Sequence, residues 1–231
     1  MMIKAFRLAL LAGLLLGSLP ARALDAGTGA PQWADNFTSR LQALALLQTL
    51  NADLLSNASA TLTLDRWCGA HDMATPPKIV ADRVRGQDKP ATAEVRALLR
   101  VSNEETVNYR RVRLRCGELV LSEADNWYVP ARLTPEMNQQ LETTDIAFGR
   151  AVKPLNFLRV TLSANLLWSP LPQGWEMART TLPPDAATPL AVPPFVIEHR
   201  AVLNLPDGTP FSALVETYTR QVLAFPVRTQ P

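Results

Sequence analysis

The hydrophobic positions of this chain follow a helical period first and a strand period later. Between residues 37 and 55, leucines and alanines recur at three- and four-residue steps, which is the spacing of an amphipathic helix. Asp35 or Asn36 can cap the start of this helix. A second, shorter helix is expected over residues 59–67, with Ser59 as its N-cap. The N-terminal part of the domain is therefore predicted to be helical.

After a proline pair at Pro76-Pro77 the pattern becomes that of extended chain. Strands are expected at 79–84, 106–114, 118–125, 195–205 and 211–225, whereas 95–101 carries mixed signals and 157–168 fits a strand or a helix. Asp207-Gly208 predicts a hairpin between the last two strands, and Thr134 with Pro135 predicts a helix start. The order of elements indicates an α+β fold with a mainly antiparallel β-sheet and N-terminal and inserted helices.

The first 23 residues have the organisation of a secretory signal peptide. Lys4 and Arg7 precede an apolar run of about a dozen residues, and Ala21-Arg22-Ala23 offers an A-x-A cleavage site. The run is shorter than the ~20 apolar residues that a membrane-spanning helix needs. We therefore expect a periplasmic or secreted protein with no membrane segment after cleavage, whose residues 24–231 form a single domain.

Charge argues against a nucleic-acid partner. The whole chain carries a formal charge of +2, but three of its cations lie in the predicted leader, so the mature chain has a net charge of −1. A near-neutral protein lacks the basic excess that phosphate contacts require. We expect no nucleic acid among the partners, and we expect a monomer.

The predicted extracytoplasmic compartment determines what the two cysteines are expected to form. In an oxidising environment, Cys68 and Cys116 most simply form one disulfide. His71 lies three residues after Cys68, but His199 is the only other histidine and no CxxC pair exists, so we expect no metal site. A catalytic Cys–His pair is the remaining alternative, and neither cysteine lies in a recognised nucleophile motif.

Four short motifs in the same order resemble the chorismate lyase family, whose fold is shared by effector-binding domains of some bacterial transcription regulators. These are Ser59-Ala60-Thr61 at a helix start, the strand 109–114 around Arg110, the turn 147–150 with Phe148-Gly149, and Gly208-Thr209-Pro210 followed by 215–218 with Glu216. The resemblance runs from about residue 41 to about residue 218.

The resemblance assigns roles that the residues alone leave open. Considered alone, Arg110 is either a carboxylate anchor or a solvated strand charge, and Glu216 fits the solvent face better than a buried position. The resemblance implies that Arg110 binds a ligand carboxylate, that Glu216 is the catalytic acid or base, and that the main chain at Phe148-Gly149 cradles the ligand. It also implies that Arg110 and Glu216 face one cavity.

Two functions follow as hypotheses. The first is elimination of pyruvate from chorismate to give 4-hydroxybenzoate, or action on a related small aromatic acid, which needs no cofactor. The second is an extracytoplasmic protein that binds a small aromatic carboxylate without catalysis. In a purely structural reading, Trp127, Tyr128 and Trp168 are ordinary core residues.

Overall fold

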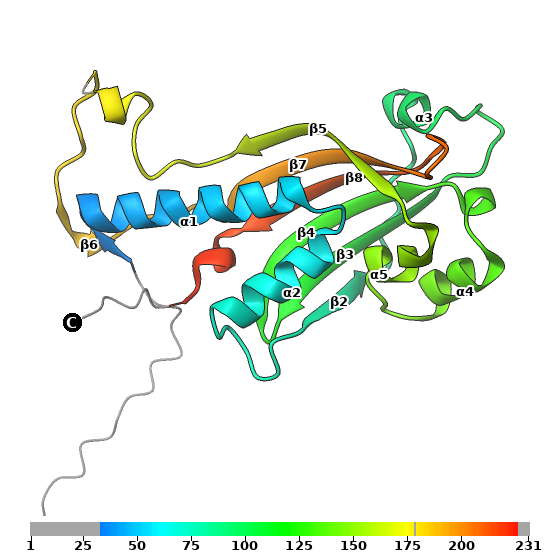
Figure 1. Ribbon diagram of the computed structural model, residues 1–231, viewed down its shortest axis with the longest axis horizontal. Helices are drawn as coiled ribbons and strands as arrows, with labels where there is room; N and C mark the ends of the chain where they lie inside the picture. Colours follow the sequence, from blue (N-terminus) through cyan, green and yellow to red (C-terminus); the bar gives the residue numbers. More distant parts are fainter. Residues whose placement is uncertain (1–32, 178, 226–231) are drawn as a thin grey trace, which may run out of the picture.

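A six-stranded antiparallel sheet lies at the centre of the protein, in the order β2-β3-β4-β8-β7-β5 (Figure 1). We analysed a computed structural model, which describes residues 33–177 and 179–225. The strands are β2 (Ile79–Val84), β3 (Asn108–Cys116), β4 (Leu119–Tyr128), β5 (Leu158–Leu166), β7 (Phe195–Asn204) and β8 (Pro210–Thr219). A separate two-stranded sheet pairs β1 (Ala34–Asp35) with β6 (Ala186–Pro189). The expected α+β fold with a mainly antiparallel sheet is confirmed.

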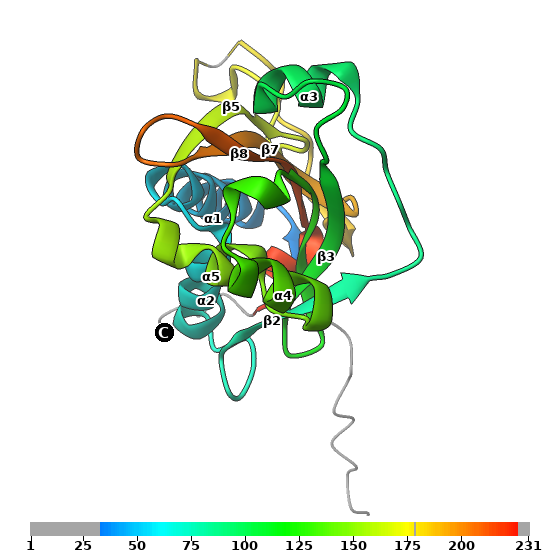
Figure 2. The same cartoon turned by 90° about the vertical axis from the view of Figure 1, so that its right-hand side faces the viewer.

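Helices cover the two faces of the sheet unequally. The α-helices are α1 (Phe37–Ser56), α2 (Ala60–Ala70), α3 (Ala93–Leu99), α4 (Pro135–Thr143) and α5 (Phe148–Ala151), and four 3₁₀ turns are η1 (Pro130–Arg132), η2 (Lys153–Leu155), η3 (Trp175–Met177) and η4 (Arg220–Leu223). Viewed along the strands, the sheet bends around α1, α2, α4 and α5 (Figure 2). On the outer face α3 packs against β8, and Leu99 joins Trp127 and Ala213 in a small apolar cluster there.

The helix starts follow the predicted capping chemistry. Asn36 caps α1 by accepting a hydrogen bond from the Ser39 amide at 2.9 Å, and Ser59 caps α2 by accepting from the Leu62 amide at 3.4 Å. Thr134 accepts from Met137, with Pro135 at the first helical position of α4. One prediction needs correction, because residues 147–150, expected as a turn, begin the short helix α5.

Tight turns join the antiparallel strands where the sequence predicts them. Gly117 (φ 56°) lies between β3 and β4, and Gly208 (φ 85°) lies between β7 and β8. The Asp207 carboxylate accepts a hydrogen bond from the Thr209 amide at 2.8 Å. A positive φ is available to glycine without a Cβ clash, so these two residues allow each hairpin to close. The ambiguous segment 157–168 contains the edge strand β5, and 95–101 contributes to the helix α3.

A disulfide ties the end of α2 to the end of β3. Cys68 and Cys116 are joined by an S–S bond of 2.03 Å, and both residues are fully buried in the apolar core to which α1 and α2 contribute. Among the described residues, no helix is both long enough and apolar enough to cross a membrane. The predicted signal peptide, residues 1–23, lies outside the described residues.

Candidate functional site

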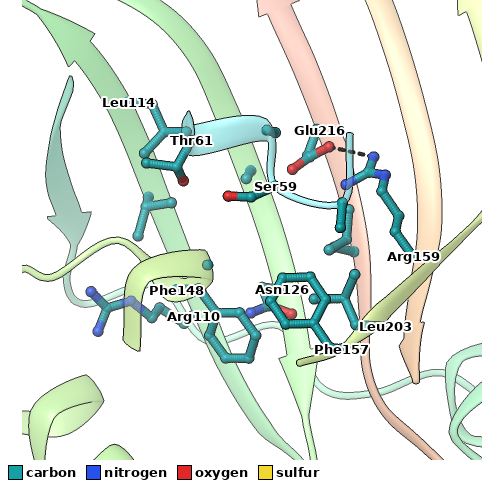
Figure 3. A pocket seen from close by; sticks show the side chains of 16 residues that line it. Ser59, Thr61, Arg110, Leu114, Asn126, Phe148, Phe157, Arg159, Leu203 and Glu216 are labelled. Atoms are coloured by element: carbon teal, nitrogen blue, oxygen red, sulfur yellow. Dashed lines mark hydrogen bonds and ion pairs between the residues drawn. The ribbon is translucent and has the colours of Figure 1, made fainter. Parts of the chain in front are cut away.

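A single cavity of about 50 Å³ brings together the residues of all four sequence motifs. It lies between the inner face of the sheet, the N-terminus of α2 and the first turn of α5 (Figure 3). The lining residues are Ala58, Ser59, Ala60, Thr61, Arg110, Val112, Leu114, Ala124, Asn126, Phe148, Gly149, Phe157, Arg159, Leu203, Leu214 and Glu216. Arg110 and Glu216 therefore share one face of the sheet and one cavity, and Phe148 and Gly149 lie on its wall.

Gly149 allows α5 to approach the start of α2 closely. A Cβ atom at position 149 would lie 2.9 Å from the Ser59 Oγ, which is closer than real Cβ contacts. The sequence resemblance assigned Gly149 to close contact with a ligand. The structure places it against the Ser59 hydroxyl, so the glycine shapes the cavity wall by bringing two helix starts together.

Glu216 is buried, and its partner is an arginine that the sequence motifs do not include. The Arg159 Nη2 donates a hydrogen bond to the Glu216 Oε2 at 2.6 Å, and the Tyr218 hydroxyl donates to the same oxygen at 3.1 Å. The side chains of Arg159 and Glu216 are 5% and 10% exposed. Burial lowers the pKa of the Arg159 guanidinium, but the adjacent Glu216 carboxylate more than offsets it, so the net pKa shift is upward. Burial and the same carboxylate raise the pKa of the Tyr218 hydroxyl.

The sequence did not point to Arg159, because the strand β5 exposes its apolar side chains and buries this charged one. Leu158, Val160 and Leu162 share one face of this strand and are 57%, 46% and 49% exposed, while Arg159 points inward. If a strand is interpreted from hydrophobicity alone, its apolar residues are expected to face the core. The buried carboxylate of Glu216 explains the inversion, since an unpaired buried charge costs several kcal/mol and Arg159 removes that cost.

The aliphatic part of the Arg110 side chain lines the cavity, but its guanidinium donates hydrogen bonds to main-chain carbonyls. Figure 3 shows the guanidinium turned away from the cavity. It donates to the carbonyls of Leu141 and Ile146, the latter at 2.6 Å, and so ties β3 to the α4–α5 connection. Burial, together with the charge of nearby Arg83, lowers the pKa of Arg110 to about 10. The two Nη groups are therefore occupied by protein oxygens, whereas the Nε has no protein partner among the described residues, so the role of Arg110 as a carboxylate anchor stays a prediction.

This arrangement predicts a structural effect of replacing Arg110. Arg110→Met should lower the free energy of unfolding by about 3 kcal/mol, because buried carbonyls lose charge-assisted partners. Urea denaturation measures the loss. Arg113→Met is a matched control on the outer face of β3, where the side chain is half exposed, and we expect a loss of about 0.5 kcal/mol or less there. Equal losses in the two variants would contradict the structural role.

Several hydrogen-bond donors at the cavity have no protein partner. The Asn126 Oδ1 accepts from the Ser212 hydroxyl at 2.5 Å, while the buried Nδ2 of Asn126 and the buried Nε of Arg159 are unpaired among the described residues. Thr61, at the first turn of α2, adds a hydroxyl to the same wall. The first amides of a helix have no intrahelical acceptor and carry a partial positive charge. The cavity wall therefore carries the Thr61 hydroxyl and the N-terminus of α2, and the unpaired donors of Asn126 and Arg159 are buried beside it.

A buried histidine lies beside the ion pair. His199 on β7 is the cross-strand neighbour of Glu216, is fully buried, and its Nε2 lies 2.7 Å from the Asn51 Oδ1 of α1. Burial lowers the pKa of His199; Glu216 acts in the opposite direction and Arg159 lowers it further. In the sequence, His199 suggested only a metal ligand or the partner of a nucleophile. The structure places it next to Glu216 on the neighbouring strand, in contact with Asn51 of α1.

The lowered pKa of His199 predicts a stability change in mildly acidic solution. Well above pH 6.5 the ring is deprotonated in both the folded and the unfolded state. As the pH falls below 6.5 the unfolded chain takes up a proton that the folded protein does not, so the free energy of unfolding decreases. Urea denaturation between pH 7 and pH 5 should show a steeper decrease for the wild type than for His199→Gln. Identical pH profiles would contradict the prediction.

Comparisons with known proteins give one close relative and several distant structures. No family model matches the sequence.

Within the described residues, no group of three or more His, Cys, Asp or Glu side chains could hold a metal ion.

The similar solved structures have low identity and low structural overlap. The possible transcriptional regulator YydK from Bacillus subtilis is 14% identical with a TM-score of 0.38; the match covers 66% of this chain and 63% of that chain. The effector domain of PhnF from Mycobacterium smegmatis is 14% identical with a TM-score of 0.44, covering 71% and 96%. The ligand-binding domain of a putative GntR-family regulator from Bordetella bronchiseptica is 14% identical with a TM-score of 0.38, covering 67% and 89%.

A curated relative is far closer in sequence. The uncharacterized protein y4mC of Sinorhizobium fredii is 64% identical over 196 residues, covering 84% of this chain and 82% of the relative. Identity at this level over most of both sequences indicates common descent and a common fold. The protein therefore belongs to the same family as y4mC of Sinorhizobium fredii.

Proposed function

We propose that this protein binds a small aromatic carboxylate in the cavity between α2, α5 and the sheet, and that it acts outside the cytoplasm. The observation that carries the proposal is the Nδ2 of Asn126, which has no partner among residues 33–177 and 179–225; Asn126 is 4% exposed and lines a cavity that also contains the N-terminus of α2. A buried donor without a partner is costly, and a ligand oxygen would satisfy it. A helix N-terminus favours a negatively charged group.

The size of the cavity suits the head group of a ligand. A volume of about 50 Å³ accommodates a few water molecules or one carboxylate. The rest of the ligand must then lie toward the opening, past Phe157 and Gly149. Phe148 and Phe157 line the cavity, and Phe148 also packs against Tyr128 with ring centroids 5.4 Å apart. Aromatic and apolar walls with a few placed donors are typical of small-molecule sites.

The hydrogen bonds to Glu216 fit ligand binding without catalysis. Arg159 and Tyr218 both donate to the Oε2 of this carboxylate, so this oxygen is held by protein donors. A general acid or base at this position would have to exchange its proton through Oε1, whereas binding needs no proton transfer. Elimination of pyruvate from chorismate is retained as the second candidate, because Glu216 lines the same cavity as Ser59 and Asn126.

The binding proposal is tested by blocking the cavity entrance. Ala58 is exposed and lines both the cavity and its opening. We expect 4-hydroxybenzoate to bind the wild type in calorimetric titrations, and Ala58→Trp to reduce the affinity at least tenfold, because the indole fills the entrance. Exposed substitutions change stability by about 0.5 kcal/mol or less, so the variant should fold normally.

Ala52→Trp is the matched control, since Ala52 is exposed on α1 and lines neither space. Its affinity should equal that of the wild type. Absence of 4-hydroxybenzoate binding to the wild type, or equal affinity in the Ala58→Trp variant, would overturn the proposed site. Incubation with chorismate and detection of pyruvate separates the two candidate functions: pyruvate release that Glu216→Gln abolishes would establish the lyase.

A further inference from the structure

A second, outer space adjoins the cavity and has a different chemical character. Its volume is about 250 Å³, and it shares Ala58, Ser59, Gly149 and Phe157 with the inner cavity. These four residues form the passage between the two spaces. We call the outer space the vestibule; its remaining lining residues are Asn57, Leu62, Arg66, Lys153 and Asn156.

The vestibule contains two cations and no acid. Within the described residues, Arg66 on α2 donates only to its own helix, to the Leu62 carbonyl at 3.3 Å and to the Thr63 hydroxyl at 3.2 Å. Lys153, in η2, has no ion pair within the described part of the chain, and no Asp or Glu lines the vestibule. Elsewhere on the protein, most arginines of the sheet are matched by carboxylates, as Arg111, Arg113 and Arg115 are. The vestibule therefore has an unbalanced positive charge next to the passage.

We propose that the ligand carries a second anionic group, a carboxylate or a phosphate-type group, which lies in the vestibule between Arg66 and Lys153. The inference rests on the proposed function and adds the chemical class of the ligand. One carboxylate enters the inner cavity, an aromatic ring fills the passage beside Phe157, and the second anion meets the two cations. A ligand that spans both spaces explains why the inner cavity is smaller than ordinary small-molecule sites, which measure about 300 Å³ or more.

The test compares ligands that differ only at the outer group. The probes are 4-(carboxymethyl)benzoate, its phosphonate analogue 4-(phosphonomethyl)benzoate, and the methyl ester of the carboxymethyl group, which keeps the shape without the charge. Calorimetric titration of the wild type should give at least one of the two dianions an affinity tenfold or more above the ester. A preference between the dianions distinguishes a carboxylate from a phosphate-type group.

The variant Arg66→Gln/Lys153→Gln should remove this advantage and leave binding of the ester unchanged. The control Lys78→Gln/Arg220→Gln removes the same net charge at exposed positions that line neither space, and it should bind like the wild type. Equal affinity for ester and dianions in the wild type overturns this inference while the proposed function stands. Failure of every probe to bind overturns both.

Discussion

Removing the disulfide should lower the free energy of unfolding by about 4 kcal/mol. The bond between Cys68 and Cys116 closes a loop with a sequence separation of 48 residues. In the chain-entropy account, such a cross-link restricts the unfolded chain by an amount between those of 15-residue and 100-residue loops, about 3 and 4.7 kcal/mol. The loop contains all of β2, α3 and β3, so the unfolded chain gains freedom across a large part of the domain.

Urea denaturation of Cys68→Ala/Cys116→Ala gives the loss directly. Wild type unfolded with and without a reductant is the control, because reduction opens the loop and keeps both sulfur atoms. Since both cysteines are fully buried, the alanine variant should lose somewhat more than the reduced wild type. A loss below about 1 kcal/mol in both cases would contradict a stabilising role for this bond.

Breaking the buried ion pair should have an effect of similar size. Arg159→Met leaves the Glu216 carboxylate in a site where its side chain is 10% exposed and lacks its cation. Removing one partner of a buried pair costs about 3–5 kcal/mol, because the remaining charge is uncompensated. We expect a loss of this size in urea denaturation at neutral pH.

The paired variant Arg159→Met/Glu216→Leu separates the charge from the packing. Replacing both partners with apolar residues of similar volume is often close to neutral. The double variant should therefore recover most of the stability that Arg159→Met loses. A double variant that is no more stable than the single variant would show that the ion pair is not the source of the effect.

The helices and hairpins could be predicted because their signals are local. The caps Asn36, Ser59 and Thr134 and the turn at Asp207-Gly208 act within a few residues, and the structure has helices and a hairpin at these positions. The cysteine pair was predictable from its count. The caps and the turn depend on hydrogen bonds within a few residues, and the disulfide depends on the presence of two cysteines that can pair.

The chemistry of the cavity could be predicted only in part, because it depends on contacts between distant strands. Glu216 looked solvent-facing among its neighbours, but Arg159, 57 residues earlier on the edge strand, supplies the cation that pairs with it when it is buried. Arg110 looked free to bind a ligand, but its guanidinium meets carbonyls more than 30 residues away. The hydrophobic pattern along the chain carries no information about contacts between distant segments. The residues that line the cavity could therefore be predicted, but the partners of Glu216 and Arg110 could not.

A crystal structure of the protein with 4-hydroxybenzoate tests the central proposal most directly. We expect ligand density in the cavity, with a carboxylate oxygen within hydrogen-bond distance of the Asn126 Nδ2 and the ring next to Phe157. The Arg110 guanidinium should still contact the carbonyls of Leu141 and Ile146. Ligand density at another site would contradict the proposed site. A cavity that stays empty when the ligand is saturating would contradict it as well.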